Sequence, residues 1–105
     1  MAQWDVYVNP VARSREWLPY LVAVQSDLLD ALPTRLVIPL SRSQVGASAL
    51  PSRLVPTFEI QGEVLALKPH EMGVMLARDL RAPVQSLRLQ AHRLVDAMDA
   101  VVSGV

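Results

Sequence analysis

The sequence predicts a mainly β domain, built as an antiparallel sheet or small barrel and followed by one C-terminal helix. Up to Leu80 the chain consists of short apolar runs separated by Pro, Gly, Asn and Ser, which is typical of strands joined by turns. No helical segment separates these runs, and strands in direct succession favour antiparallel pairing. Only after Pro83 do apolar residues recur at spacings of three and four, the period of an amphipathic helix.

The size and composition of the chain fit a single domain spanning residues 1–105. A length of 105 residues allows one compact core and leaves no room for two. Hydrophobic residues make up 51% of the sequence and charged residues 19%, which is too apolar for a disordered chain. Aromatic residues make up only 5%, so Val, Leu, Ile, Ala and Met must fill the core.

Two strands are expected near the N-terminus. Residues 3–8 alternate in strand fashion and end at an Asn-Pro pair, which favours a turn. The alternation places three apolar side chains on one face: Trp4, Val6 and Val8. Residues 17–25 are mostly apolar, which indicates a strand buried on both faces. Residues 26–33 carry acidic side chains around a Leu pair and are expected to form a loop or a short helical turn.

The next apolar run, residues 35–40, predicts a third strand. Proline cannot donate a hydrogen bond to a neighbouring strand, so Pro39 restricts this strand to a sheet edge, a bulge or a strand end. Residues 41–52 are rich in Ser and Ala and show no periodicity, and we expect them to form an excursion outside the main sheet.

The following segment has the pattern of a β-hairpin. Residues 54–60 and 63–67 both read as strands, and Gln61-Gly62 between them suits a tight turn. Residues 72–80 supply a further apolar strand.

The C-terminal segment predicts one amphipathic helix. Ser86 is a candidate N-cap with Pro83 before it, and Gly104 suits the left-handed geometry that ends a helix. The apolar stripe that would face the sheet comprises Val84, Leu87, Ala91, Leu94, Met98 and Val101.

Charge and residue usage limit the function classes. Ten Lys and Arg balance ten Asp and Glu, so the chain lacks the basic surplus of a dedicated nucleic-acid binder. A local basic patch remains open, because four arginines lie close in sequence: Arg78, Arg81, Arg88 and Arg93. The chain opens without a signal-peptide pattern and has no apolar run long enough to cross a bilayer, which leads us to expect a cytoplasmic protein without membrane contact.

The residues point to a binding module without catalytic, metal or cofactor chemistry. Without cysteine, disulfides and thiolate chemistry are excluded. His70-Glu71 begins like a zinc-protease motif, but Val74 occupies the position of the required second histidine. The glycines are dispersed, so no phosphate-binding loop is apparent. These patterns do not identify the partner.

Several segments together resemble the CcdB family of toxins. The most specific is Leu21–Asp30, which matches the family run V-x-V-Q-S-D-hydrophobic-hydrophobic-D. It is followed by Arg35–Leu40, similar to the family strand R-hydrophobic-V-I-P-L. Val6-Tyr7 in the first strand, Leu54–Glu63 with a proline ahead of a polar turn, and the terminal Gly104-Val105 agree in order and spacing. The resemblance spans nearly the whole chain.

The resemblance implies a fold, a mechanism and partners. Members of this family are homodimers with an SH3-like barrel, shared with MazF-like toxins, and a C-terminal helix. They bind the A subunit of DNA gyrase and trap its complex with cleaved DNA, without acting as enzymes. A cognate CcdA-like antitoxin releases gyrase, and the two proteins together repress their own operon. Contact with DNA is expected only within that complex, through the antitoxin.

The resemblance also implies which residues contact gyrase. The matching positions are Ser26, Leu28, Asp99, Val102, Ser103, Gly104 and Val105. The chain departs from the family at two of them, because a tryptophan usually precedes the terminal glycine, where this chain has Ser103, and Val102 replaces a bulky aromatic residue. Losing a cation–π contact of that tryptophan would cost ~1–2 kcal/mol.

Two alternatives remain open at this stage. A non-toxic family member that only binds antitoxin for autoregulation would tolerate Ser103. An mRNA-cleaving toxin of the same barrel fold would need a basic groove with an acid–base pair, which the neutral net charge and sparse histidine disfavour.

Overall fold

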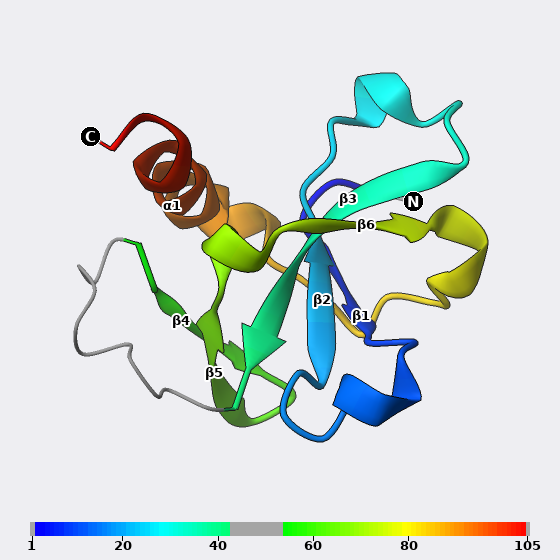
Figure 1. Cartoon of the computed structure of the whole chain (residues 1–105), viewed down its shortest axis with the longest axis horizontal. Helices are drawn as coiled ribbons and strands as arrows, with labels where there is room; N and C mark the ends of the chain where they lie inside the picture. Colours follow the sequence, from blue (N-terminus) through cyan, green and yellow to red (C-terminus); the bar gives the residue numbers. More distant parts are fainter. Residues whose placement is uncertain (1, 43–53, 105) are drawn as a thin grey trace.

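The computed structural model describes residues 2–42 and 54–104 of the chain. Within them, strands form one curved sheet and a single α-helix follows (Figure 1). The strands are β1 (Asp5–Val8), β2 (Tyr20–Ala23), β3 (Thr34–Ser41), β4 (Thr57–Ile60), β5 (Glu63–Leu67), β6 (Gly73–Leu76) and β7 (Gln85–Ser86). The helix is α1 (Ala91–Ser103), and short 3₁₀ turns include η1 (Ala12–Ser14), η2 (Asp27–Leu29), η4 (Pro69–Glu71), η5 (Ala77–Asp79) and η6 (Arg88–Gln90).

The sheet is antiparallel throughout and forms a nearly closed barrel. Its strand order is β4-β5-β3-β2-β1-β7, and β6 also pairs with β3. The long β3 is the centre of the sheet: it pairs with β2 along one side, and with β6 and then β5 along the other. The mainly β fold with one C-terminal helix, predicted from the order of apolar runs, is confirmed.

Side chains join the two outer strands, β4 and β7, where no ladder closes the barrel. Gln61 Nε2 donates to the carbonyl oxygen of Val84 over 2.8 Å. In return, Gln85 Nε2 donates to the carbonyl oxygen of Glu59 over 2.9 Å, and Gln85 Oε1 accepts from the Gln61 main-chain N–H over 3.2 Å. This glutamine seam satisfies main-chain groups at the open edges.

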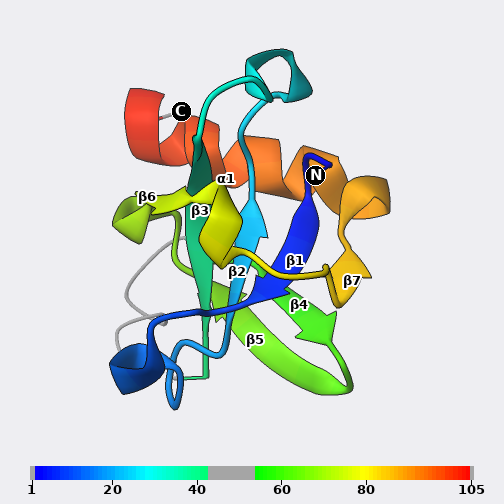
Figure 2. The same ribbon diagram turned by 90° about the vertical axis from the view of Figure 1, so that its right-hand side faces the viewer.

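Apolar side chains fill both faces of the sheet. The first core lies between the sheet and α1, which crosses one end of the strands in Figure 2. It is built from Val6, Val22, Val24, Ile38, Leu40, Phe58, Ile60, Leu65, Leu67, Leu87, Leu94 and Ala97. A smaller second core on the opposite face comprises Tyr7, Leu21, Ala23, Val37 and Leu80. Because β2 contributes to both cores, it is buried on both faces, as predicted.

The predicted hairpin is confirmed and has the geometry its turn residues favour. Gln61 and Gly62 both adopt positive φ, at 51° and 83°, between the paired strands β4 and β5. Positive φ at both central residues is the signature of a type I′ turn, whose twist matches that of the flanking strands.

Pro39 lies within the central strand and not at an edge, which corrects the expectation for this residue. Pairing with β6 stops at Val37, and pairing with β5 starts at Leu40. The Pro39 carbonyl accepts from the Lys68 N–H over 3.0 Å, so its main-chain groups face the gap between those two strands. Proline lacks a main-chain N–H, but this loses no ladder hydrogen bond here, because neither β5 nor β6 pairs with β3 at Pro39.

The predicted start of the helix was wrong. Ser86 belongs to β7, which pairs with β1, and the Leu87 N–H donates to the Trp4 carbonyl over 2.9 Å. Sheet pairing therefore occupies the main chain through Leu87, and α1 begins only at Ala91 after η6. The spacing of three between Val84 and Leu87 extended the helical period too far back along the sequence, because a local period does not reveal pairing with a strand that is distant in sequence. The predicted end at Gly104 is confirmed, with φ at 74°.

Three further expectations need adjustment. β1 starts at Asp5 because Trp4 has a positive φ of 75°, and Val8 is 44% exposed, so the predicted apolar face holds only in part. The predicted strand over residues 72–80 is shorter, since η5 follows β6. The excursion over residues 41–52 lies almost wholly outside the described residues.

No helix among residues 2–42 and 54–104 has the length and apolar character to span a membrane.

Candidate partner-binding surface

The helix α1 is fixed to the barrel along its first turns. Leu94 and Ala97 are buried in the first core. Arg93 fastens the helix to β4: its Nη2 donates to the Thr57 carbonyl over 2.7 Å, and its guanidinium lies 4.3 Å from the centre of the Phe58 ring. Such a cation–π contact adds to the packing energy.

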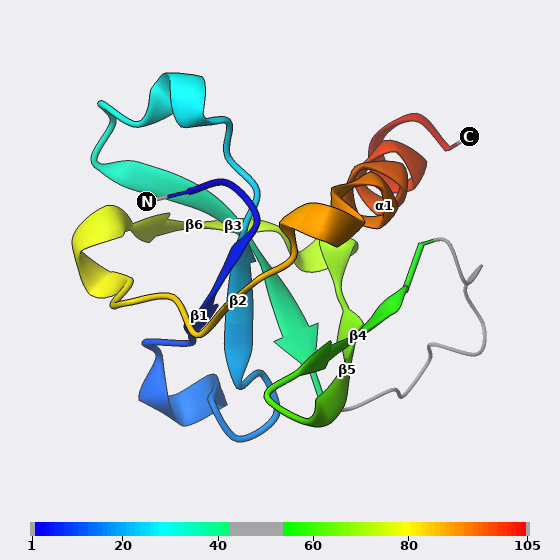
Figure 3. The ribbon, with the colours of Figure 1, turned by 180° about the vertical axis from the view of Figure 1, so that it is seen from behind.

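Beyond Met98, which still packs against the first core, the last turn of the helix is exposed. We call Asp99 to Gly104 the α1 tip. Val102 is 82% exposed, and Asp99, Ser103 and Gly104 are exposed as well. The Ser103 hydroxyl donates to the Asp99 carbonyl over 2.7 Å, so its polar group is turned back onto the helix. Figures 1 and 3 show the tip at the periphery of the molecule.

The other predicted site residues lie in the β2–β3 loop, residues 24–33. Ser26 Oγ accepts from the Leu28 main-chain N–H over 3.2 Å and begins η2. Leu28 is 94% exposed at the top of this loop. Gln25 supports the loop from below: its Nε2 donates to the Thr34 carbonyl over 3.0 Å, and its Oε1 accepts from the Leu36 N–H over 3.0 Å.

Arg35 is the strongest support of the β2–β3 loop. It is buried, and its guanidinium donates to the main-chain carbonyls of Asp30, Leu32 and Thr34. The Asp30 carboxylate lies 3.8 Å away as a partly exposed ion pair. A guanidinium offers donors in a rigid fork, so one side chain fixes several loop carbonyls at once.

Tyr7 in the second core interacts electrostatically with Arg35 and Asp30 and has a perturbed pKa. Burial raises the pKa of Tyr7 to about 12, with a further contribution from the Asp5 carboxylate, while Arg35 acts in the opposite direction. The neutral phenol is therefore the form that the fold favours. On the exposed rim, Arg42 donates hydrogen bonds to Glu63 and lowers the pKa of that carboxyl.

The structure of the chain does not bring the two sets of predicted residues together. The α1 tip and the β2–β3 loop lie on the same upper side of the molecule but toward opposite ends of its long axis (Figures 1 and 3). Val105, the last predicted contact, lies outside the described residues. Neither exposed element carries a cluster of acid–base groups. Among the residues that the structure describes, no three His, Cys, Asp or Glu side chains gather closely enough to hold a metal ion.

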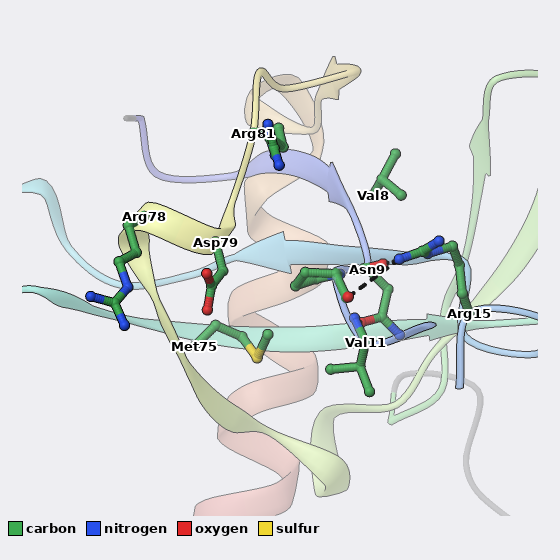
Figure 4. Close-up of a pocket in the computed structure, with 9 residues that line it drawn as sticks. Val8, Asn9, Val11, Arg15, Met75, Arg78, Asp79 and Arg81 are labelled. Carbon is green, nitrogen blue, oxygen red and sulfur yellow. Dashed lines mark hydrogen bonds between the residues drawn. The ribbon is translucent and has the colours of Figure 1, made fainter. Parts of the chain in front are cut away.

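One further feature escaped the sequence analysis. A groove of about 530 Å³ lies between the end of β1 and the segment after β6, away from the α1 tip (Figure 4). Arg15 from one wall and Arg78 and Arg81 from the other line it. Two of these arginines stood out as neighbours in sequence, but nothing in the sequence connected them with Arg15.

Comparison with known proteins identifies a family. A search of curated proteins found no match. The family model of the CcdB protein matches residues 3–104, which is nearly the whole chain and includes both the β2–β3 loop and the α1 tip. The chain therefore belongs to the CcdB family, whose members are toxins of toxin–antitoxin systems.

Proposed function

We propose that this protein is a non-enzymatic toxin that binds the A subunit of DNA gyrase in the cytoplasm and traps the enzyme on cleaved DNA. The observation that carries the proposal is the α1 tip: an exposed aliphatic side chain, Val102, stands beside a left-handed Gly104 at the end of an anchored helix. A Cβ added at Gly104 would have no other atom within 4 Å, so the main chain of a partner has room to approach closely.

The proposed mechanism needs binding energy and no catalytic group. A ligand that binds one state of an enzyme cycle more tightly than the others increases the population of that state. A toxin of this kind adds its binding energy to the gyrase state in which DNA is cut. An exposed apolar tip on a rigid support suits this task, because little ordering entropy is lost on binding.

The same proposal includes two protein partners. In a homodimer, the tips of two protomers would act together on a symmetric target. A cognate CcdA-like antitoxin would compete for the toxin and release gyrase. In the complex of toxin and gyrase, the exposed Leu28 of the β2–β3 loop would supply a second contact with gyrase.

A gyrase cleavage assay tests this function. Purified protein is incubated with gyrase, ATP and supercoiled plasmid, and trapped complexes are revealed as linear DNA after detergent and protease treatment. We expect linear DNA with the wild-type chain and much less with a Val105 deletion. An absence of linear DNA at a large excess of wild-type protein over gyrase contradicts the proposal.

Ser103 favours one second candidate, a family member that binds antitoxin but no longer poisons gyrase. The matched variant is Ser103→Trp, which restores the residue usual in the family. Because Ser103 is exposed and outside the core, the change should leave folding intact. A gain of ~10-fold in cleavage potency from a weakly active wild type supports the toxin. Activity only in the Ser103→Trp variant establishes the second candidate.

A further inference from the structure

Leu89 in η6 is among the most exposed apolar side chains of the molecule. It is 94% exposed, as is Leu28, and Val102 follows at 82%. Among the described residues, these three are the most exposed large apolar side chains. The family resemblance implies gyrase contacts for Leu28 and Val102 but assigns no role to Leu89. Single exposed leucines are common on protein surfaces, so the position of Leu89 decides what its exposure means.

Leu89 lies at one end of a ridge whose other end is the α1 tip. The buried Leu94 and Ala97 define the inner face of α1, and residues spaced three and four apart on the opposite side form its outer face. We call this face, extended back into η6, the outer ridge, and all its members are exposed: Leu89, His92, Asp96, Asp99 and Ser103. At ~1.5 Å per residue the outer ridge is about 20 Å long. It is therefore continuous with the proposed gyrase contact at the tip.

The turn that carries Leu89 is supported on both sides. Leu87 is buried in the first core, and its main-chain N–H is bonded to the Trp4 carbonyl. The Gln90 N–H donates to the Leu87 carbonyl over 2.9 Å, and Gln90 Oε1 accepts from Arg93 Nη1 over 2.7 Å. Arg93 is the residue that fastens α1 to β4. A side chain presented on such a support loses little ordering entropy of the main chain on binding.

The turn η6 lies on the same side of the molecule as the two proposed contacts. Figures 1 and 3 show it, in orange, on the upper side and between the β2–β3 loop and the α1 tip along the long axis. Figure 2 shows α1 crossing the barrel from η6 toward the C-terminus. A protein surface that covers both the loop and the tip therefore has η6 within its reach.

The charges of the outer ridge indicate the kind of surface that fits it. In the described part of the chain, no hydrogen bond or ion pair engages the carboxylates of Asp96 and Asp99. Arg88 adds a positive charge at the Leu89 end, so the negative charge lies in the half toward the tip. Carboxylates repel the phosphates of DNA and attract cationic side chains. The outer ridge therefore fits a basic protein surface with an apolar recess, and not the DNA that gyrase holds.

We propose that Leu89 is a further contact with the A subunit of gyrase, and that the contact runs along the whole outer ridge from the α1 tip to η6. Cationic side chains of gyrase would face Asp96, and an apolar recess would receive Leu89. This inference rests on the proposed function, because it extends the same surface.

The test measures binding of the full chain to immobilised, purified gyrase A subunit. We expect Leu89→Ala to weaken binding ~10-fold, because most of a buried leucine side chain is lost. Leu89→Met keeps an apolar side chain of similar size and should stay within about twofold of the wild type. The matched control is Val64→Ala, which truncates a 57% exposed aliphatic residue on β5 and should change affinity by less than about twofold. Thermal unfolding should be the same in all three variants, since these side chains are exposed.

A charge variant tests the middle of the outer ridge. Asp96→Asn should weaken binding ~3-fold and reduce the dependence of the affinity on salt, because one attraction to a cationic surface is removed. Glu59→Gln, which neutralises an exposed carboxylate on β4, is the control and should leave both quantities unchanged.

The remaining outcomes overturn the inference. If Leu89→Ala binds like the wild type while the Val105 deletion loses binding, the outer ridge is not part of the contact and the proposed function stands. If the wild type itself does not bind the A subunit, both fail. Analytical ultracentrifugation supplies the last arm: a change of oligomeric state in Leu89→Ala would assign the outer ridge to contacts between copies of this chain and not to gyrase.

Discussion

The α1 tip and the β2–β3 loop both present an exposed aliphatic side chain, but they support it in different ways. Leu28 stands on a loop whose carbonyls are held from below by the buried guanidinium of Arg35 and by Gln25. Val102 stands on the last turn of a helix that is anchored further back, by Arg93 on β4 and by Leu94, Ala97 and Met98 on the first core. The loop is fastened at its base by polar side chains, and the tip is held by its own helical hydrogen bonds.

The two elements should therefore respond to different perturbations. A loop held by a buried side chain loses its shape when that side chain is removed, because its carbonyls then lack the donor that holds them together. A helical tip keeps its shape when distant polar contacts change, but it depends on the docking of the helix and on the geometry of its last residue. The following experiments separate the two.

Removing the anchor of α1 should have the largest effect. Leu94 is fully buried, and Leu94→Ala should lower the free energy of unfolding by ~2–5 kcal/mol, as large-to-small core changes do. Urea denaturation measures the change. The matched control, Val95→Ala, alters an exposed neighbour and should shift stability by less than ~0.5 kcal/mol. An equal loss of unfolding free energy in both variants would contradict the role of Leu94 as the anchor of α1.

Titration of Tyr7 in the second core should destabilise the fold. Tyr7 is 1% exposed, and its pKa is raised from 10.0 to about 12 in the fold, so the unfolded chain loses this proton first. Stability should be insensitive to this group below pH 10 and fall by ~1.4 kcal/mol per pH unit between 10 and 12. Urea denaturation across this range measures the slope. A Tyr7→Phe variant should have a flatter profile, and an identical slope in both proteins contradicts the assignment.

Arg35→Met should loosen the loop and spare the tip. The change removes the donors for the carbonyls of Asp30, Leu32 and Thr34, and we expect a loss of ~1–3 kcal/mol. Amide hydrogen exchange should rise in the loop while the amides of α1 stay protected. Arg13→Met, which changes an exposed arginine, is the control. Faster exchange throughout α1 would mean that loop and helix are not independent.

Gly104→Ala should have the smallest effect on stability and act only at the tip. A Cβ at this position meets nothing within 4 Å, so the cost of ~1 kcal/mol comes only from the left-handed φ of 74°. Exchange of the last helical amides should increase, and gyrase trapping should decrease. Ser103→Ala, which keeps ordinary helical geometry, should preserve the helix end. If both variants behave alike, the left-handed residue is not what fixes the tip.

The sequence predicted the parts of this molecule that depend on local patterns. The alternation along β4, the Gln61-Gly62 turn and the terminal glycine act through nearby residues, and each was confirmed, whereas the alternating face predicted for the first strand holds only in part. The start of α1 was missed because pairing of β7 with β1 joins residues far apart in sequence. The position of Pro39 was missed because only the sheet reveals a gap between two neighbours of one strand.

The candidate surface followed the same rule. Exposure at Leu28 and Val102 agrees with a role in contacts, and their positions came from a family resemblance. The support by Arg35 had no sequence signal, because it depends on how deeply one arginine is buried. The groove likewise could not be predicted from the sequence, since Arg15 and Arg78 come to line the same groove only through the fold.

The glutamine seam has a consequence for how copies of this chain meet. Along β4 and at the start of its turn, every second residue turns a main-chain group outward. Three of these groups are occupied: the carbonyls of Thr57 and Glu59 by Arg93 and Gln85, and the N–H of Gln61 in the turn by Gln85 as well. A strand edge capped in this way offers little template for another chain to add a strand. At high protein concentration, this edge therefore disfavours aggregation of the chains through strand pairing.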